Sequence, residues 1–154
     1  MRLRLVTRAT IRIGAGVVIV SGLVVACATG QARTSAHRAT HVVDVTVENF
    51  RIDLPPSVPA GTVRFRIHGA GPTMHEFNVM RTDLAATALP LAENGTVDDT
   101  TPHADATHIA EAEGIDIDQT KDLTVHLSPG DYVVYCNMDG HYQAGMTAAL
   151  QVTA

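Results

Sequence analysis

The residues of this sequence best suited to metal chemistry are one cysteine, two histidines and one methionine. Cys136, His141 and Met146 lie in a single short segment, and His75 lies far upstream. Together these side chains offer one thiolate, two imidazoles and one thioether. Soft sulfur favours Cu(I) and imidazole also accepts Cu(II), so a trigonal His₂Cys site with a weak axial Met tolerates both oxidation states. The four residues therefore form the ligand set of a mononuclear blue-copper site, which is suited to moving one electron.

The spacing of these residues allows the four side chains to meet at one point. Cys136 ends one predicted strand and Met146 begins the next, with His141 midway between them. Two glycines within this loop supply bends that residues with side chains resist. His75 follows a Gly-Pro break and comes from a neighbouring predicted strand. The loop offers a single thiolate, which argues against a binuclear copper centre.

Each of these residues also has a simpler interpretation. Cys136 fits a buried core thiol, because cysteine is often found in protein interiors. His75 fits a hydrogen-bonded core histidine, and Met146 fits ordinary core packing. The occurrence of all four residue types at these spacings favours the ligand interpretation for each of them.

The first 26 residues are typical of an export signal. Four arginines precede a run of apolar and small residues, which is too short to span a bilayer comfortably. The run ends in Leu23-Val24-Val25-Ala26-Cys27 and resembles the lipobox of bacterial lipoprotein signals. In such signals the cysteine receives a diacylglyceryl group and becomes the first mature residue, so we expect Cys27 to be lipidated. The alternatives are an ordinary signal peptide with an incidental cysteine and an uncleaved anchor.

Cleavage before Cys27 changes the charge of the protein substantially. The full chain has 154 residues and a formal charge of −5, and removal of residues 1–26 leaves 128 residues with seven basic and 16 acidic side chains, a charge of −9. This balance disfavours nucleic acids and anionic membrane surfaces and favours basic partners. A Cys27–Cys136 disulfide would consume the predicted copper ligand, so we expect no such bond.

Residues 41–154 have the alternating apolar pattern of β-strands, whereas residues 27–40 lack aromatic and large aliphatic side chains and are predicted to form a flexible tether. Gly- and Pro-containing turns separate the predicted strands. About seven short strands punctuated in this way predict an all-β Greek-key sandwich or barrel. The predicted strands are 43–48, 50–54, 62–67, 73–80, 122–127, 131–136 and 147–152.

One short helix is predicted within an acidic stretch, residues 82–120, that contains neither Lys nor Arg. Thr101 would be its N-cap, Pro102 its first residue and Gly114 the residue after its C-terminus. On this helix His103 and His108 would project from roughly opposite faces. We therefore predict no second metal site there.

The Cys-x₄-His-x₄-Met spacing of residues 136–146 resembles the cupredoxin family, and it is most similar to the rusticyanin and sulfocyanin-like branches. The resemblance extends over residues 41–154. It includes the segments Val58-Pro59-Ala60-Gly61-Thr62, His75-Glu76-Phe77 and Ser128-Pro129-Gly130-Asp131-Tyr132.

The resemblance implies a role for each ligand and also exposes two departures. By analogy with the family, His75, Cys136 and His141 are equatorial ligands and Met146 is the axial ligand of one type 1 copper. Many cupredoxins have proline at the position of Asp139, and several have asparagine or serine at the position of Glu76. Ligation is expected to survive both changes, but both positions are expected to influence the reduction potential.

These observations predict a lipid-anchored, monomeric one-electron carrier at the outer face of the cytoplasmic membrane, acting between larger redox proteins. His141 is the expected exit for the electron, within an apolar patch formed by Met138, Tyr142 and Ala144. One alternative is a module that stores or delivers copper without cycling electrons, and another is a metal-free interaction domain. An enzyme is disfavoured because a site with four protein ligands leaves no open position for substrate.

Overall fold

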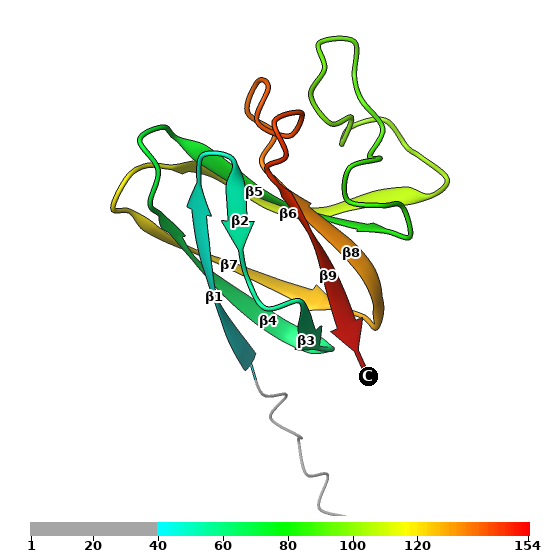
Figure 1. Ribbon diagram of the computed structural model, residues 1–154. Coiled ribbons are helices and arrows are strands. Elements are labelled where there is room, and N and C mark those ends of the chain that lie inside the picture. The colour runs from blue at the N-terminus through cyan, green and yellow to red at the C-terminus, as the bar shows by residue number, and fades with distance from the viewer. Residues whose placement is uncertain (1–39) are drawn as a thin grey trace, which may run out of the picture. The chain divides into compact units, whose positions relative to one another are not determined.

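The computed structural model describes residues 40–154, which fold into nine β-strands arranged in two sheets (Figure 1). The predicted signal peptide, the lipidated Cys27 and the tether lie outside the described residues, apart from residue 40, which begins the first strand. No helix within residues 40–154 is long and apolar enough to cross a membrane. The strands are β1 (Thr40–Glu48), β2 (Arg51–Asp53), β3 (Ser57–Pro59), β4 (Gly61–Gly69), β5 (His75–Thr82), β6 (Ala106–Ile115), β7 (Thr120–Leu127), β8 (Gly130–Tyr135) and β9 (Thr147–Thr153).

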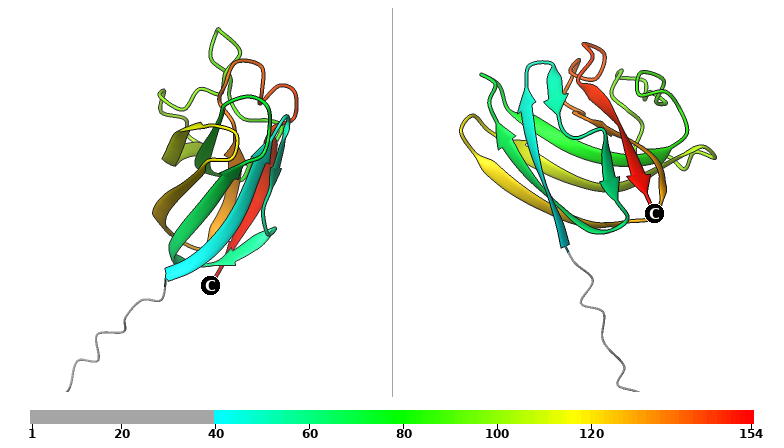
Figure 2. Two further views of the ribbon diagram at one scale, coloured as in Figure 1. Left: turned by 90° about the vertical axis from the view of Figure 1, so that its left-hand side faces the viewer. Right: turned by 60° about the horizontal axis from the view of Figure 1, so that its bottom comes forward.

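The two sheets face each other as a sandwich (Figure 2). One has four strands in the order β2-β1-β4-β7, and the other has five in the order β3-β9-β8-β5-β6. Most neighbouring strands are antiparallel, but β1 pairs with β4 and β3 pairs with β9 in parallel. The predicted all-β sandwich is confirmed, with seven strands close to their expected positions.

The core lies between the sheets and follows the alternation in the sequence. On β1, the valines at 43, 45 and 47 are buried, while the residues between them face outward or are only partly covered. Phe65 on β4 and Phe77 on β5 meet across the core with ring centroids 5.2 Å apart. Each fully buried aliphatic or aromatic side chain contributes about 1.5–3 kcal/mol relative to exposure. This core holds β5 and β8 side by side, and it thereby positions His75, the first residue of β5, and Cys136, the residue after β8.

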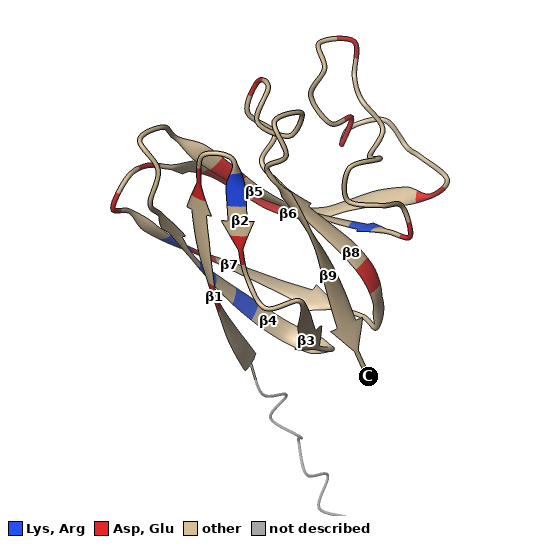
Figure 3. Cartoon of the chain, viewed as in Figure 1, with Lys and Arg blue, Asp and Glu red and all other residues tan. Residues whose placement is uncertain are grey.

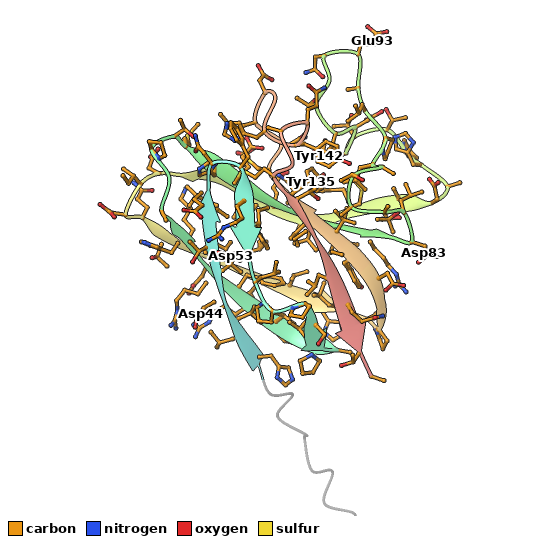
Figure 4. The ribbon with its side chains drawn as sticks, in the orientation of Figure 1. Asp44, Asp53, Asp83, Glu93, Tyr135 and Tyr142 are labelled. Atoms are coloured by element: carbon orange, nitrogen blue, oxygen red, sulfur yellow. The ribbon has the colours of Figure 1, made fainter. Side chains whose placement is uncertain are left out.

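A second, smaller cluster lies on the outer face of the five-stranded sheet, beneath the long excursion formed by residues 83–105. Tyr142, from the loop after β8, is buried there and pins the excursion, because its hydroxyl donates to Ala86 O and accepts from Leu89 N, both at 2.9 Å. Figure 4 shows Tyr135 and Tyr142 beside each other, and their ring centroids are 6.2 Å apart. The cluster consists of Met80, Leu89, Val97, Ala106, Val133, Tyr135 and Tyr142.

The predicted helix is wrong, because most of its residues form strand β6. β6 pairs antiparallel with the edge of β5 from His75↔Ile115 to Thr82↔Ala106. Pairing with an exposed strand edge outweighs the helical preference of an alanine- and glutamate-rich segment. Gly114 has φ 61° and lies in a register shift of the ladder, so it forms a bulge and does not end a helix.

Candidate metal centre

The loop between β8 and β9 carries three of the four predicted ligands. Its backbone is closed by Cys136 N donating to Met146 O at 3.1 Å and by Met146 N donating to His141 O at 3.0 Å. A further bond runs from His141 N to Met138 O at 2.9 Å. These bonds place the three predicted ligands around one short backbone ring at the end of the sandwich.

The fourth predicted ligand, His75, begins β5, and the pairing of β5 with β8 brings it to the same place. The register Asn78↔Tyr135 aligns the start of β5 with the end of β8. One ligand atom each from His75, Cys136 and His141 lie within 4.8 Å of one another. Cys136 Sγ is 3.4 Å from His141 Nδ1, and the two imidazole centroids are 5.2 Å apart.

The interior of this group is shielded from water. His75, Cys136 and Met146 are fully buried, and His141 is half-buried. Neither ring nitrogen of His75 has a hydrogen-bond partner. A buried polar atom without a partner costs free energy, and a metal ion would satisfy one of these nitrogens. The residues present therefore fit a copper ion by both donor chemistry and burial.

The protonation states of the buried ligands also suit metal binding. Burial lowers the pKa of His75, and the neighbouring His141 lowers it further, so His75 is neutral as a ligand must be. Burial raises the pKa of the Cys136 thiol, and backbone N–H groups of Glu76 and Met138 oppose this effect. A thiolate here therefore requires a cation beside the sulfur.

Met146, the predicted axial ligand, lies at the end of the ligand loop and is fully buried in the core. Its backbone is bonded to both Cys136 and His141, as described above. The structure thus brings His75, Cys136 and His141 together and seats Met146 on the same backbone ring. Their binding of a metal stays a prediction.

The two departures from the family pattern have different surroundings. The backbone N–H of Glu76 donates to Cys136 Sγ at 3.3 Å, so this position contacts the sulfur irrespective of its side chain. The Glu76 carboxyl is half-buried, and burial raises its pKa. The side chain of Asp139 is exposed at the tip of the loop.

Sequence analysis missed three residues that shape the site. Phe50 lies edge-on to the imidazole of His141, with centroids 5.3 Å apart, and is 45% exposed. Gly71 lies so close to His75 that an added Cβ would be 2.8 Å from Nε2. Asn137 binds the excursion through Val97, accepting from its N–H at 2.7 Å and donating to its carbonyl at 3.1 Å. No local sequence pattern predicts the contacts of Phe50 and Asn137, because each joins segments that are distant in sequence.

Comparison with known proteins relates this chain to others through structure. No protein-family model matches the sequence, and no curated protein matches it. Auracyanin A, a "blue" copper protein from the green thermophilic photosynthetic bacterium Chloroflexus aurantiacus, is 19% identical with a TM-score of 0.52, covering 75% of this chain and all of the other. Rusticyanin from Thiobacillus ferrooxidans is 18% identical with a TM-score of 0.54, covering 74% and 77%. Auracyanin from the photosynthetic bacterium Roseiflexus castenholzii is 20% identical with a TM-score of 0.50, covering 76% and 99%.

At these identities the likeness establishes the fold, which is that of the cupredoxins. The predicted fold family is therefore confirmed. The ligand set at the end of this fold comes from the chain's own residues and not from the comparison.

Proposed function

We propose that this chain is a mononuclear type 1 copper protein that carries one electron between other redox proteins. The observation that carries the proposal is the convergence of a thiol and two imidazoles on one water-shielded point, with both nitrogens of His75 unpaired. When bound, copper supplies reversible exchange between Cu(I) and Cu(II). The solved structures with this fold include proteins described as copper proteins, which supports the same conclusion.

Other residues of this chain hold the ligands in place and tune the site. The Glu76 N–H holds the sulfur of Cys136, and such hydrogen bonds to a ligand sulfur tune the potential of a metal site. The rigid β5–β8 pair fixes His75 relative to Cys136. A site held in this way reorganises little when its charge changes, because the ligands are fixed by packing and by the closed loop.

His141 is the proposed exit for the electron, since it is the half-buried member of an otherwise buried set. Phe50 beside it offers an exposed apolar contact surface. The expected patch needs one change, because Tyr142 is buried under residues 83–105 and does not face a partner. Phe50 replaces it in the proposed docking surface.

A basic redox partner and a lipid anchor on Cys27 are also part of the proposal. Residues 40–154 hold all 16 acidic residues of the chain but only five Lys and Arg. In Figure 3 acidic residues occupy the tips of the loops above β8 and β9, whereas the basic ones lie on strands. Negative charge at the proposed docking end favours a positive partner.

A copper titration tests this function. We expect uptake of one copper per chain and a strong absorption near about 600 nm from the thiolate–Cu(II) pair. Cys136→Ser should abolish the band, while Ser128→Ala, on the turn before β8 and so at the opposite end of that strand from Cys136, should preserve it. Absence of stoichiometric uptake would favour the metal-free interaction domain.

A further inference from the structure

A second group of metal-ligating side chains lies outside the proposed copper centre. Asp99, in the long excursion, and His108 and Glu111, on β6, each place one ligand atom so that all three lie within 4.8 Å of one another. The three ligand atoms of the proposed copper centre satisfy the same limit. One imidazole and two carboxylates are therefore gathered on the outer side of the five-stranded sheet.

One ring nitrogen of His108, Nε2, lacks a hydrogen-bond partner. This nitrogen is shielded from solvent, and the nearest carboxylate oxygen, Glu111 Oε2, is 3.6 Å away, beyond hydrogen-bond distance. Within residues 40–154, four of the five buried side-chain atoms without a partner are imidazole nitrogens. Two belong to His75, and the others belong to His103 and His108. Of these nitrogens, two lie in the proposed copper centre and one, Nε2 of His108, lies in the second group, whereas Nε2 of His103 lies 3.3 Å from Asp98 Oδ2.

The carboxylate of Asp99 is oriented by two neighbours. Its Oδ2 accepts from Asn137 Nδ2 at 3.0 Å and lies 3.5 Å from the hydroxyl of Tyr135. Burial raises the pKa of Tyr135, and the charge of Asp99 raises it further, so the hydroxyl stays protonated as a donor. Both contacts use Oδ2, so Oδ1 of Asp99 is left to bind a metal ion. Outer hydrogen bonds that orient a ligating carboxylate are a general feature of metal sites.

The surroundings of this group attract a cation. Residues 82–120 contain no Lys or Arg. The arginine ion pairs of residues 40–154 are made to Asp44, Glu48, Asp53 and Asp122, and none involves Asp99 or Glu111. Carboxylates without a basic partner create a negative potential, which concentrates divalent cations.

An open surface pocket borders the group. Its volume is about 360 Å³, and its walls include Asp99, His103 and His108. Glu111 is itself partly exposed at the neighbouring surface. An ion can therefore reach the three ligand atoms and keep water in its remaining coordination positions.

We propose that Asp99, His108 and Glu111 form a second metal site, which binds one divalent transition-metal ion of the Zn²⁺ type. Zinc binds His nitrogen and carboxylate oxygen, and sites with three protein ligands are completed by water. The imidazole disfavours Mg²⁺ and Ca²⁺, which prefer oxygen ligands. The sequence prediction argued against a site here because it placed His103 and His108 on opposite faces of a helix. In β6 a register shift opposite Val79 and Met80 adds one residue between His108 and Ala110, and it therefore brings His108 and Glu111 to the same side of the sheet.

Zinc titration of the copper-loaded protein tests the proposal, since copper occupies the thiolate site. Calorimetry should detect one saturable equivalent of Zn²⁺. His108→Gln and Glu111→Gln should each weaken the affinity at least about 10-fold. The exposed His68 on β4 offers a matched control, and His68→Gln should bind Zn²⁺ as the wild type does.

Repeating the titration on Cys136→Ser separates this site from the copper function. The Cys136→Ser protein should still bind Zn²⁺ at the second group, and adding His108→Gln should weaken that binding by the same factor as in the copper-loaded wild type. Glu111→Gln serves as the second variant, because its side chain is 47% exposed and its loss should not disturb folding. Absence of saturable binding, or binding unchanged in both His108→Gln and Glu111→Gln, would overturn the proposal.

Discussion

At the scale of single residues, the proposed copper centre depends on contacts that surround the ligands as much as on the ligands. His75 is fully buried with both nitrogens unpaired, and the sulfur of Cys136 receives a backbone N–H from Glu76. The space beside His75 is kept by Gly71, because any Cβ there would press on the imidazole. Function thus constrains a position that carries no side chain.

Gly71→Ala should disturb the site without unfolding the protein. The new Cβ would lie 2.8 Å from His75 Nε2 and 3.0 Å from both the backbone N and the side-chain Oδ1 of Asn49, so the imidazole must shift. Overpacking of this kind costs about 1–3 kcal/mol. We expect weaker copper affinity and an altered absorption band. Ala70→Ser adds one atom at the exposed neighbouring position and should change neither, and an unaltered Gly71→Ala spectrum would contradict the account.

Asp98 provides a prediction for pH. Its Oδ1 accepts from Thr101 N at 2.9 Å and from Thr100 N at 3.3 Å, and these bonds, together with His103 nearby, lower its pKa to about 2. Because the folded-state pKa lies below the unfolded value of about 3.8, the ionised carboxylate stabilises the fold above that pH. This stabilisation should disappear as the pH falls towards 2.

Acid titration of Asp98→Asn measures this effect. The free energy of unfolding of the wild type should exceed that of Asp98→Asn at pH 5, and this difference should vanish near pH 2. Asp83→Asn, at another exposed position of the excursion, is the control. A gap that stays constant over this pH range would rule out a role for the ionised carboxylate.

At the scale of elements, the excursion of residues 83–105 is fastened to the ligand loop by Tyr142. Tyr142→Phe removes the hydroxyl that bonds Leu89 N and Ala86 O. The buried Leu89 N–H is left without a partner, while Ala86 O keeps its bond from Thr147 Oγ1 at 3.1 Å. We expect a loss of about 1–3 kcal/mol and faster amide exchange at Leu89. Tyr132→Phe removes a bond to Ser128 O at 3.0 Å and serves as the control. Exchange at Leu89 that differs no more than in the control would show that the excursion is held by other contacts.

Much of the fold was predictable because most of its strands are half-buried and alternate visibly, as β1 does with its three inward valines. β6 was not predictable in this way, because its alanines and glutamates favour a helix. The segment forms a strand only because it pairs with β5. The short β3 was missed because it includes Pro59 and depends on pairing with β9. Local patterns reveal local preferences, and pairing between distant segments decides these two elements.

The candidate site likewise contains residues that could be predicted from the sequence and residues that could not. Cys136, His141 and Met146 share one loop, so their spacing alone predicts that their side chains converge. His75 could be predicted because it follows a Gly-Pro break at the start of a neighbouring strand. Phe50 and the second metal group required the tertiary arrangement. Residues 83–105 lack any regular element that would fix where Asp99 lies. Their packing against β5 and β8 and the hydrogen bonds from Asn137 place it.

At the scale of the whole molecule, charge is distributed unevenly between the ends of the sandwich. Glu93 projects from the excursion at the end that carries the ligand loop, and Asp44 lies towards the other end on β1 (Figure 4). An acidic docking end accelerates association with a basic partner, and salt at 0.1 M largely screens the attraction between charges that are more than about 10 Å apart.

Reversing these charges separately tests the direction of steering. The rate of electron transfer to a basic cytochrome c should fall as the ionic strength rises from about 0.01 M to about 0.15 M. Glu93→Lys should lower the low-salt rate, and Asp44→Lys should leave it nearly unchanged. Equal effects of the two substitutions would show that only net charge matters and not the docking end.

We propose that this chain cycles one electron on one bound copper. Voltammetry of the copper-loaded protein, with copper content measured before and after repeated cycles, tests it most directly. The account predicts a reversible one-electron wave and full retention of copper in both oxidation states. Release of the ion upon reduction, or the absence of a reversible wave, would contradict the carrier assignment and favour copper storage or delivery.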